Sequence, residues 1–447
     1  RRLDALVPGA ASEPTGLAEN LRADAELRGH RIGAPHLPAD RVAPGADYAR
    51  WVIHTAAGTR QLPGAVVHTD RPESGDDDPH GAASDATPVV DDAAIAEAHD
   101  ALRATWRLFA DEFSYSSVDG HGTPLSVTVH FGQRYANAFW DGRQLVAGDG
   151  DGIVFDRFTR SPDVLAHEFV HGVTQYTAGL GHEGEPGAVN ESICDVFASM
   201  VKQRLLGQAV ESADWLLGED LLLPGVRGRA VRSLRDPGGA YDDPRIGCDP
   251  QVAEMASYVR AGSTGAGADA GPVDEVDAAH INAGIANRAF YLAATGLGGH
   301  SWTDAGSIWW AALVSGSVTA DTGFTGFAAA TVSAAGRLYG PGSAEVRVTR
   351  DAWREVGVVI TASHIIVRRT GGFAGRAVER SVDVADVAEL LGRVDLHAMA
   401  TREQLPPQPD RYAYRITTDL ARVELGEPEV TPELQQLIDR VLGEGGP

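Results

Sequence analysis

Cysteine is scarce in this chain, which has only Cys194 and Cys248 among 447 residues. So few thiols exclude a disulfide framework as the basis of the fold. The two cysteines can pair or remain as buried thiols, and in a chain of this length the second outcome is the more frequent one. Long apolar runs are also missing, because the nearest candidate, 307–320, is short and interrupted by Ser and Gly. We therefore expect no membrane insertion.

Positive charge is the second deficit, since 38 Lys and Arg residues face 62 Asp and Glu residues, for a net charge of −24. Phosphate contacts need clustered Lys and Arg, so nucleic acids and anionic membranes are excluded as expected partners. The hydrophobic share of 43% and the charged share of 22% are typical of folded, soluble proteins. The length suggests about three domains.

Hydrophobic periodicity predicts a mixed chain in which helices dominate the middle. Helices are expected near 17–27 and over 93–109, 162–205, 280–296, 303–316 and 325–339, with a strand over 125–131 and a solvated acidic loop over 69–92. After Val358 the pattern changes to a small α+β module. Its strands are expected over 364–369 and 412–418, and its helices over 384–394 and 432–442.

The most informative motif is H-E-F-V-H at 167–171. Residues four apart share one face of a helix, so His167 and His171 can both reach one zinc ion. Glu168 lies beside that face, where its carboxylate can hold a water at the metal. By itself the motif also fits an ordinary amphipathic helix with two hydrogen-bonded histidines.

A second helical segment, N-E-S-I-C-D at 190–195, begins 19 residues after His171. Glu191 can complete a His₂Glu ligand set, which leaves the fourth zinc position open as catalytic zinc requires. Asp195 follows one turn later on the same face and can accept a hydrogen bond from the outer N–H of a ligand histidine. The alternative for both carboxylates is an exposed helix face.

Three segments resemble the thermolysin family of metallopeptidases, in particular its protealysin-like branch. They are HEFVHGVTQYTAGL from 167, GAVNESICDVFASMVKQ from 187 and HINAGIANRAFYLAATGLGG from 280. The resemblance extends from about Leu62 to Val358. It implies an α+β fold of two lobes, β-rich and then helical, with a zinc cleft between them and a small α+β domain after them.

The resemblance also implies roles for the motif residues. His167, His171 and Glu191 correspond to the zinc ligands, and Glu168 corresponds to the general base. His280, at the start of H-I-N-A-G-I, corresponds to the histidine that hydrogen-bonds the developing oxyanion. Its alternative is a histidine that caps the start of a helix.

Three further residues are assigned by the same resemblance. Glu275 stands where the family has an Asp that orients the histidine, although it can equally be a surface carboxylate. Arg232 corresponds to an arginine that binds a substrate carbonyl, with a structural salt bridge as the alternative. His182 replaces a family Tyr that helps to bind the oxyanion, and an imidazole can also donate there.

Substrate binding is expected along an edge strand and in an apolar pocket. Asn137 and the backbone of Ala138 match the strand that pairs with an extended substrate. The pocket for the residue after the scissile bond is built by apolar side chains that would otherwise be core residues. They are Phe155, Phe158, Val164, Leu217 and Val231.

The double calcium site of thermolysin is expected to be degraded. Asp163, Asp214 and Glu219 remain, but Lys202 and Leu216 occupy ligand positions. An ammonium group there would repel Ca²⁺, which prefers several carboxylate oxygens.

Both ends of the chain have an interpretation. Residues 1–48 resemble a protealysin-like propeptide that lacks its first residues, with an ordinary N-terminal extension as the alternative. Residues 363–447 resemble emfourin, a protein inhibitor of protealysin-like peptidases, through VRRTGGFAG at 367–375 and RYAYRITT at 411–418. An unrelated small α+β domain is the alternative.

The sequence therefore predicts a zinc endopeptidase, made as a zymogen, that cleaves peptide bonds before bulky hydrophobic residues. Its lobes are expected at 49–208 and 209–360, and the inhibitor-like domain at 363–447 is expected to restrain it within or between chains. The competing hypothesis is a permanently blocked peptidase that acts as a binding protein. We expect secretion, without an ordinary signal peptide, and a cytoplasmic location is the alternative.

Overall fold

The computed structural model describes ten parts of the chain. They are residues 50–70, 91–263, 272–360, 364–371, 377–391, 393–394, 396, 399, 411–418 and 422–444. The chain forms two compact units. The first extends to Phe327 and includes Glu355–Val358, and the second comprises Ala328–Arg354 and the residues from Val359 onward. The expectations for 1–48 and most of the acidic loop lie outside the described residues, as does the GGFAG stretch after Gly371.

The first unit begins with a mixed five-stranded sheet in the order β2-β1-β3-β5-β4. Its strands are β1 Trp51–Thr55, β2 Ala65–Asp70, β3 Leu125–Val129, β4 Ala138–Trp140 and β5 Gln144–Ala147. The three inner strands run parallel, whereas β2 and β4 pair antiparallel at the two edges. The inner strands are almost wholly buried, as parallel strands usually are, and β2 is the most exposed.

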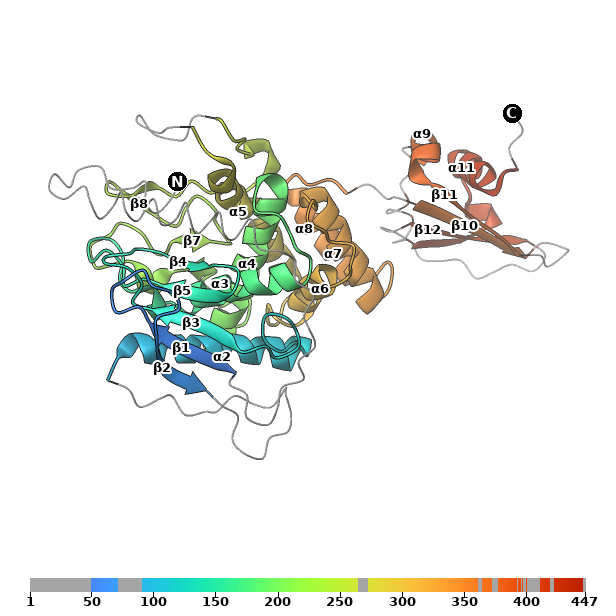
Figure 1. Ribbon diagram of the computed structural model, residues 1–447. Helices are drawn as coiled ribbons and strands as arrows, with labels where there is room; N and C mark the ends of the chain where they lie inside the picture. Colours follow the sequence, from blue (N-terminus) through green and yellow to red (C-terminus); the bar gives the residue numbers. More distant parts are fainter. Residues whose placement is uncertain are drawn as a thin grey trace. The chain divides into compact units, whose positions relative to one another are not determined.

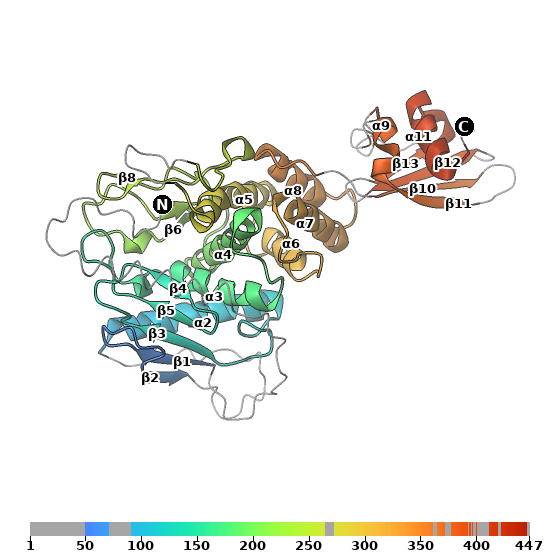
Figure 2. The same ribbon diagram turned by 45° about the horizontal axis from the view of Figure 1, so that its top comes forward.

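Three long helices build the centre of this unit. They are α2 Ala93–Phe113, α3 Pro162–Tyr176 and α4 Gly184–Leu205. Every residue of α4 from Gly187 to Gln203 is buried, so this helix is apolar or tightly packed all around, as a core helix must be. It contacts α3 and also α5, Glu275–Leu297, and these helices lie together in Figures 1 and 2.

Shorter elements connect and extend these helices. They are the 3₁₀ turns at Phe158–Arg160, Glu219–Leu221 and Met255–Ser257, the two-residue strands β6 Leu216–Leu217, β7 Arg232–Ser233, β8 Asp242–Asp243 and β9 Gly247–Cys248, and the helices α6 Asp304–Leu313, α7 Phe324–Tyr339 and α8 Ala344–Glu355. In the second unit, the indole N–H of Trp353 in α8 donates to Thr331 Oγ1 of α7 at 2.9 Å. Among the described residues, no helix is long and apolar enough to cross a lipid bilayer.

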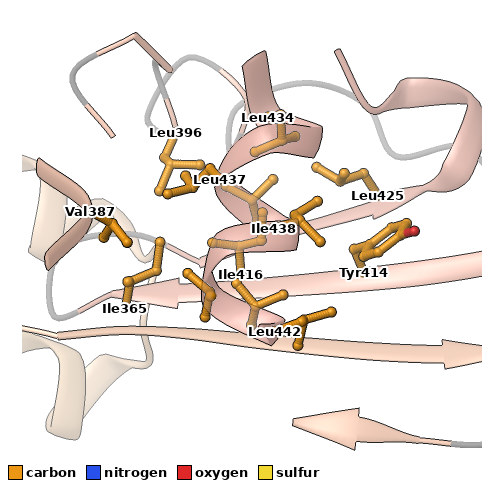
Figure 3. Close-up of a cluster of buried hydrophobic side chains, with 13 residues drawn as sticks. Ile365, Val387, Leu396, Tyr414, Ile416, Leu425, Leu434, Leu437, Ile438 and Leu442 are labelled. Atoms are coloured by element: carbon orange, nitrogen blue, oxygen red, sulfur yellow. The ribbon is translucent and has the colours of Figure 1, made fainter. Parts of the chain in front are cut away.

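The rest of the second unit is a four-stranded antiparallel sheet in the order β11-β10-β12-β13, with a helix on one face. Its elements are β10 His364–Gly371, β11 Val378–Asp383, a 3₁₀ turn at Val384–Val387, α9 Ala388–Leu391, β12 Tyr412–Thr418, β13 Arg422–Gly426, a 3₁₀ turn at Glu427–Glu429 and α11 Pro432–Leu442. Figure 3 shows Leu434, Leu437 and Ile438 of α11 directed toward Ile416 and Tyr414 of the sheet.

Several expected elements have the predicted type with shifted ends. Helix α2 continues four residues past 109, and the region 162–205 is two helices, because residues 177–183 form a turn containing Gly179 in the left-handed region. The acidic loop predicted from residue 69 begins two residues later in the structure, since Thr69 and Asp70 belong to β2. The expected helix over 384–394 is a 3₁₀ turn followed by one short α-helical turn.

Candidate metal centre

The two histidines of the H-E-x-x-H motif meet on one face of α3. Pro162 occupies the first turn of this helix, where its missing N–H needs no partner. His167 and His171 are buried, and their Nε2 atoms lie 3.2 Å apart. Two imidazole nitrogens at this separation are suited to share one cation, so the two histidines form a candidate zinc site.

Glu191 of α4 faces this histidine pair. Its Oε2 lies 3.4 Å from His167 Nε2, and its Oε1 lies 3.5 Å from His171 Nε2. Burial alone would raise the pKa of Glu191, but His280, His171 and His167 hold it well below its ordinary value. Its buried Oε2 makes no hydrogen bond with the described residues. An ionised carboxylate with an unsatisfied buried oxygen beside two imidazoles fits a His₂Glu zinc set.

Asp195 is the anchor of the centre. Its Oδ1 lies 2.8 Å from His167 Nδ1 and accepts a hydrogen bond from Arg232 Nη1 at 2.6 Å, while its Oδ2 accepts from Asn287 at 2.8 Å. Burial would raise the pKa of Asp195, but Arg232 and His167 lower it. The outer nitrogen of His167 therefore faces a carboxylate, and Arg232 forms the salt bridge that the sequence left as an alternative.

Glu168 joins α3 to the edge of the sheet. Its Oε2 accepts a hydrogen bond from the backbone N–H of Trp140 in β4 at 2.8 Å, and the side chain is buried. The adjacent residues Asn137 and Ala138 lie at and just before the start of β4, an edge strand as the resemblance implied. The carboxylate is therefore fixed next to both the histidine pair and the outer strand of the described sheet.

His280 also lies at the centre, but its expected support differs. Its Nε2 is 3.3 Å from Glu191 Oε2, and its Nδ1 is 2.8 Å from the carbonyl oxygen of Val276. Among the described residues, Glu275 makes no hydrogen bond or ion pair with His280. Glu275 is the first residue of α5, directly after the N-cap Asp274. The backbone of Val276 holds the ring instead.

His182 lies in the turn between α3 and α4, close to the histidine pair. Its ring centre is 6.4 Å from that of His171, and its Nδ1 is 3.4 Å from Asn190 Nδ2. Asn190 also donates to the carbonyl oxygens of Leu180 and Gly181, both at 3.2 Å. The amide of Asn190 thus holds the turn that carries His182.

Cys194 is a further residue at the centre, and no motif in the sequence gave it a role there. Its Sγ lies 3.2 Å from His171 Nδ1, and it could be grouped with the two histidines as a metal ligand. We favour Glu191 as the third ligand, because its oxygens face the two Nε2 atoms whereas the sulfur lies at the outer nitrogen of His171. Cys194 follows Glu191 by three residues and so lies on the same side of α4, but spacing alone does not show that it meets His171. Neither cysteine forms a disulfide, and Cys248 is exposed rather than buried as expected.

The five residues expected to form the apolar pocket occupy neighbouring segments. Phe155 and Phe158 are buried, with ring centres 6.1 Å apart. The N–H of Val231 donates to the carbonyl oxygen of Leu217 at 2.9 Å, beside the β6–β7 pair. Val164 is half-buried in the first turn of α3.

At the expected calcium position the structure places the ammonium of Lys202. Nζ lies 3.1 Å from Asp214 Oδ2, 3.2 Å from Glu219 Oε2 and 3.1 Å from the carbonyl oxygen of Leu216. Burial would lower the pKa of Lys202, but Asp163 and Asp214 raise it above its ordinary value. A protonated amine therefore occupies the centre of these oxygen donors.

The site combines a histidine pair with a neighbouring glutamate and a facing carboxylate, and it lies between a β-rich and a helical part. This arrangement defines the class of zinc-dependent metallopeptidases. Family comparison agrees. The thermolysin metallopeptidase catalytic domain matches residues 56–175, its α-helical domain matches 178–358, and the emfourin family matches 367–442. The chain belongs to the thermolysin family of metallopeptidases and is a metalloendopeptidase of the protealysin-like type.

Individual relatives support the same assignment. An extracellular metalloprotease of Pectobacterium carotovorum is 42% identical over 316 residues, covering 70% of this chain and 83% of that protein. Protease PrtS of Photorhabdus is 39% identical over 308 residues, which cover 69% of this chain and 76% of that protein. The solved precursor of protealysin from Serratia proteamaculans is similar with a TM-score of 0.61 at 38% identity, covering 75% of this chain and 98% of that one.

Proposed function

We propose that this chain is a zinc endopeptidase in which His167, His171 and Glu191 hold the metal and Glu168 is the general base. The observation that carries the proposal is the convergence of two Nε2 atoms and the Glu191 carboxylate at one buried point. Asp195 would orient His167 and increase its basicity as a ligand. Bound zinc supplies Lewis acidity, which polarises a peptide carbonyl and makes water a stronger nucleophile near neutral pH.

The protein's own groups would carry the protons. Glu168 lies next to the histidine pair and accepts the proton of the attacking water. It then passes that proton to the leaving amine, so that the C–N bond breaks and the amine departs as a neutral group. The hydrogen bond from the Trp140 N–H holds the Oε2 of Glu168 and so fixes the position of this carboxylate for the transfer.

His280 and His182 would stabilise the oxyanion. The carbonyl oxygen of Val276 can only accept a hydrogen bond, so the Nδ1 of His280 carries a proton. The Nε2 of His280 can therefore donate only when the ring is doubly protonated. The pKa of His280 is below its ordinary value, mainly because of burial. The doubly protonated form is therefore disfavoured, and a second donor, His182, would be needed for the oxyanion. His182 would therefore be the oxyanion-hole donor while His280 is neutral, and the Nε2–H of His280 would donate as well when that ring is protonated.

Substrate would add a strand to β4. The backbone around Asn137 and Ala138 lies at the sheet edge, where an extended peptide can pair with main-chain groups. The apolar residues near Phe158 and Leu217 favour a bulky hydrophobic residue after the scissile bond. Arg232 is engaged by Asp195, and its remaining donors would bind a substrate carbonyl.

The test compares peptides that differ only in the residue after the scissile bond. Zinc-loaded protein should cleave a peptide with Leu or Phe there at least tenfold faster, by kcat/KM, than one with Asp. Phenanthroline should abolish both reactions, and added zinc should restore them. Activity that survives complete zinc removal would contradict the metal assignment.

We further propose that the chain is made as a zymogen, is secreted, and is restrained by its module at 363–447. The match to emfourin supports the last point, and the name of the Pectobacterium relative supports secretion. A tether gives an effective concentration in the millimolar range when it can span the sites, so even a micromolar contact would keep most molecules closed.

Deletion of 363–447 tests this restraint. The truncated protein should have a higher kcat/KM, and the module added as a separate chain should lower it again. Restraint within one chain is unchanged by dilution, whereas restraint between chains decreases on dilution. A truncated enzyme that is no faster, with a module that inhibits nothing, would refute the restraint while leaving the peptidase assignment intact.

A permanently blocked peptidase that acts as a binding protein is the second candidate. Such a protein would be expected to have lost Glu168, a ligand or His280, and this chain retains them all. Equal inactivity of the full and the truncated zinc-loaded protein would favour this candidate.

A further inference from the structure

A second group of histidine and carboxylate side chains lies in the first unit, on β2 and α2. His68 and Asp70 are two residues apart on β2 and therefore share one face of the strand, and His99 lies on the helix α2. A ligand atom of each lies within 4.8 Å of the others. The imidazole rings are 5.3 Å apart and nearly perpendicular, and His99 Nε2 is 3.6 Å from Asp70 Oδ1.

The polar atoms of this group are incompletely satisfied. His68 Nε2 and Asp70 Oδ2 are buried and make no hydrogen bond with the described residues. Asp70 and His99 are themselves 5% and 1% exposed. Buried polar atoms without partners cost free energy, so a native structure that retains two of them in one place calls for an explanation. A shared cation would satisfy both atoms.

The outer nitrogen of His99 has the support typical of a metal ligand. Its Nδ1 lies 3.3 Å from the carboxylate of Asp100, which leaves Nε2 directed at Asp70. A ligand histidine usually donates its other N–H to a carboxylate or carbonyl, and this fixes the ring and its tautomer. The pair His99–Asp100 therefore resembles the pair His167–Asp195 at the catalytic centre.

From this geometry we infer that His68, Asp70 and His99 form a second zinc site, separate from the catalytic centre. Two imidazoles and one carboxylate favour Zn²⁺ over Ca²⁺ or Mg²⁺, which prefer oxygen ligands. Tetrahedral zinc needs ligand atoms about 3.4 Å apart, and rotation of the half-buried His68 ring would close the remaining distance. The edge position of β2 gives the ion an entry path.

The site has a structural role. Strand β2 is an edge strand that pairs only with β1 in the described sheet. Zinc would tie β2 to α2 through side chains and so add a connection that main-chain hydrogen bonds do not provide. This role is independent of the proposed peptidase mechanism.

The test uses the Glu168→Gln protein, in which autolysis is suppressed. After zinc loading and gel filtration, it should contain two zinc ions per chain by mass spectrometry. His68→Gln and the nearly isosteric Asp70→Asn should each reduce this number to one. His54→Gln is the matched control, because His54 is a buried histidine on the neighbouring strand β1 outside the group, and it should retain two.

Thermal unfolding separates this site from the catalytic centre. In His171→Ala, which lacks a proposed catalytic ligand, zinc should still raise the Tm by several degrees, and addition of His68→Gln should remove this rise. If the Glu168→Gln protein holds one zinc ion, or if His68→Gln and Asp70→Asn leave two, the group is a plain polar cluster and the inference is wrong.

Discussion

Lys202 is the only lysine in the chain, and its ammonium donates to three acceptors within residues 214–219. Besides Asp214, Glu219 and the Leu216 carbonyl, the fully buried Asp163 lies close enough to raise the pKa of Lys202. We expect Lys202 to act as an internal cation that links α4 to the loop before β6. Replacement of Lys202 by Met should leave these carboxylates without a counter-charge.

The magnitude follows from the burial of the partners. Removal of one member of a buried ion pair costs about 3–5 kcal/mol. The lower value applies because Asp214 and Glu219 are 32% and 51% exposed, so water replaces part of the loss. At roughly 2 °C per kcal/mol for a unit of this size, Lys202→Met should lower the Tm by about 6 °C.

Differential scanning calorimetry of inactive Glu168→Gln protein provides the assay. The control is Arg204→Met on the same helix, which removes partly exposed ion pairs with Asp111 and Glu112 and should cost less than about 1 kcal/mol. Lys202→Glu should be less stable still, and millimolar Ca²⁺ should restore it, because four carboxylates and a carbonyl then surround one site. Calcium should not change the Tm of the parent protein. A Tm for Lys202→Met equal to that of Arg204→Met, or calcium stabilisation of the parent, would refute the reasoning.

Three further predictions concern the catalytic centre and the sheet. Glu168→Gln should retain zinc by metal analysis but lower kcat by orders of magnitude. Full activity of this variant would exclude Glu168 as the general base. His167→Ala should lose zinc stoichiometry, whereas Asp195→Asn should weaken zinc affinity only about 10- to 100-fold in a competition titration; equal zinc content in both would contradict their roles. The Asp149 carboxylate raises the pKa of His130 to about 9, so its stabilisation is complete below pH 6.5 and is lost as pH rises through 9. His130→Asn, which tolerates the left-handed backbone there, should therefore cost about 1 kcal/mol in urea unfolding at pH 6 and nothing near pH 10, and a pH-independent difference would exclude the ion pair as its cause.

Long periodic elements could be predicted from the sequence because their signal extends over several turns. Helix α2 and strand β12 have the expected type, and β12 has the expected bounds of 412–418. The short strands β1 and β5 could not be predicted, because four or five mostly buried residues show no alternation, and β4 was expected only from the family resemblance. Their identity is set by neighbours in the sheet that are distant in sequence.

The same limit applies to the candidate metal centre. Spacing along a helix predicted that His167 and His171 share a face, and that Glu191 and Asp195 do. It could not find the contact of Cys194 with His171, which depends on how α3 and α4 approach each other. It also assigned the support of His280 to Glu275, whereas the contact that the structure gives to the Nδ1 of His280 is with the carbonyl oxygen of Val276.

Asp195 shows why a single residue can matter to both function and fold. Its two oxygens receive groups from three elements: His167 of α3, Arg232 of β7 and Asn287 of α5. The contact with His167 follows from two helical motifs, but those with Arg232 and Asn287 join residues 37 and 92 positions away. Because its charge is fully buried, each lost partner leaves the carboxylate less compensated. The orientation of His167 and the packing of α5 against α4 are thus coupled through the side chain of Asp195. Substitutions at Arg232 or Asn287 should therefore change the metal centre, although neither residue is a proposed metal ligand.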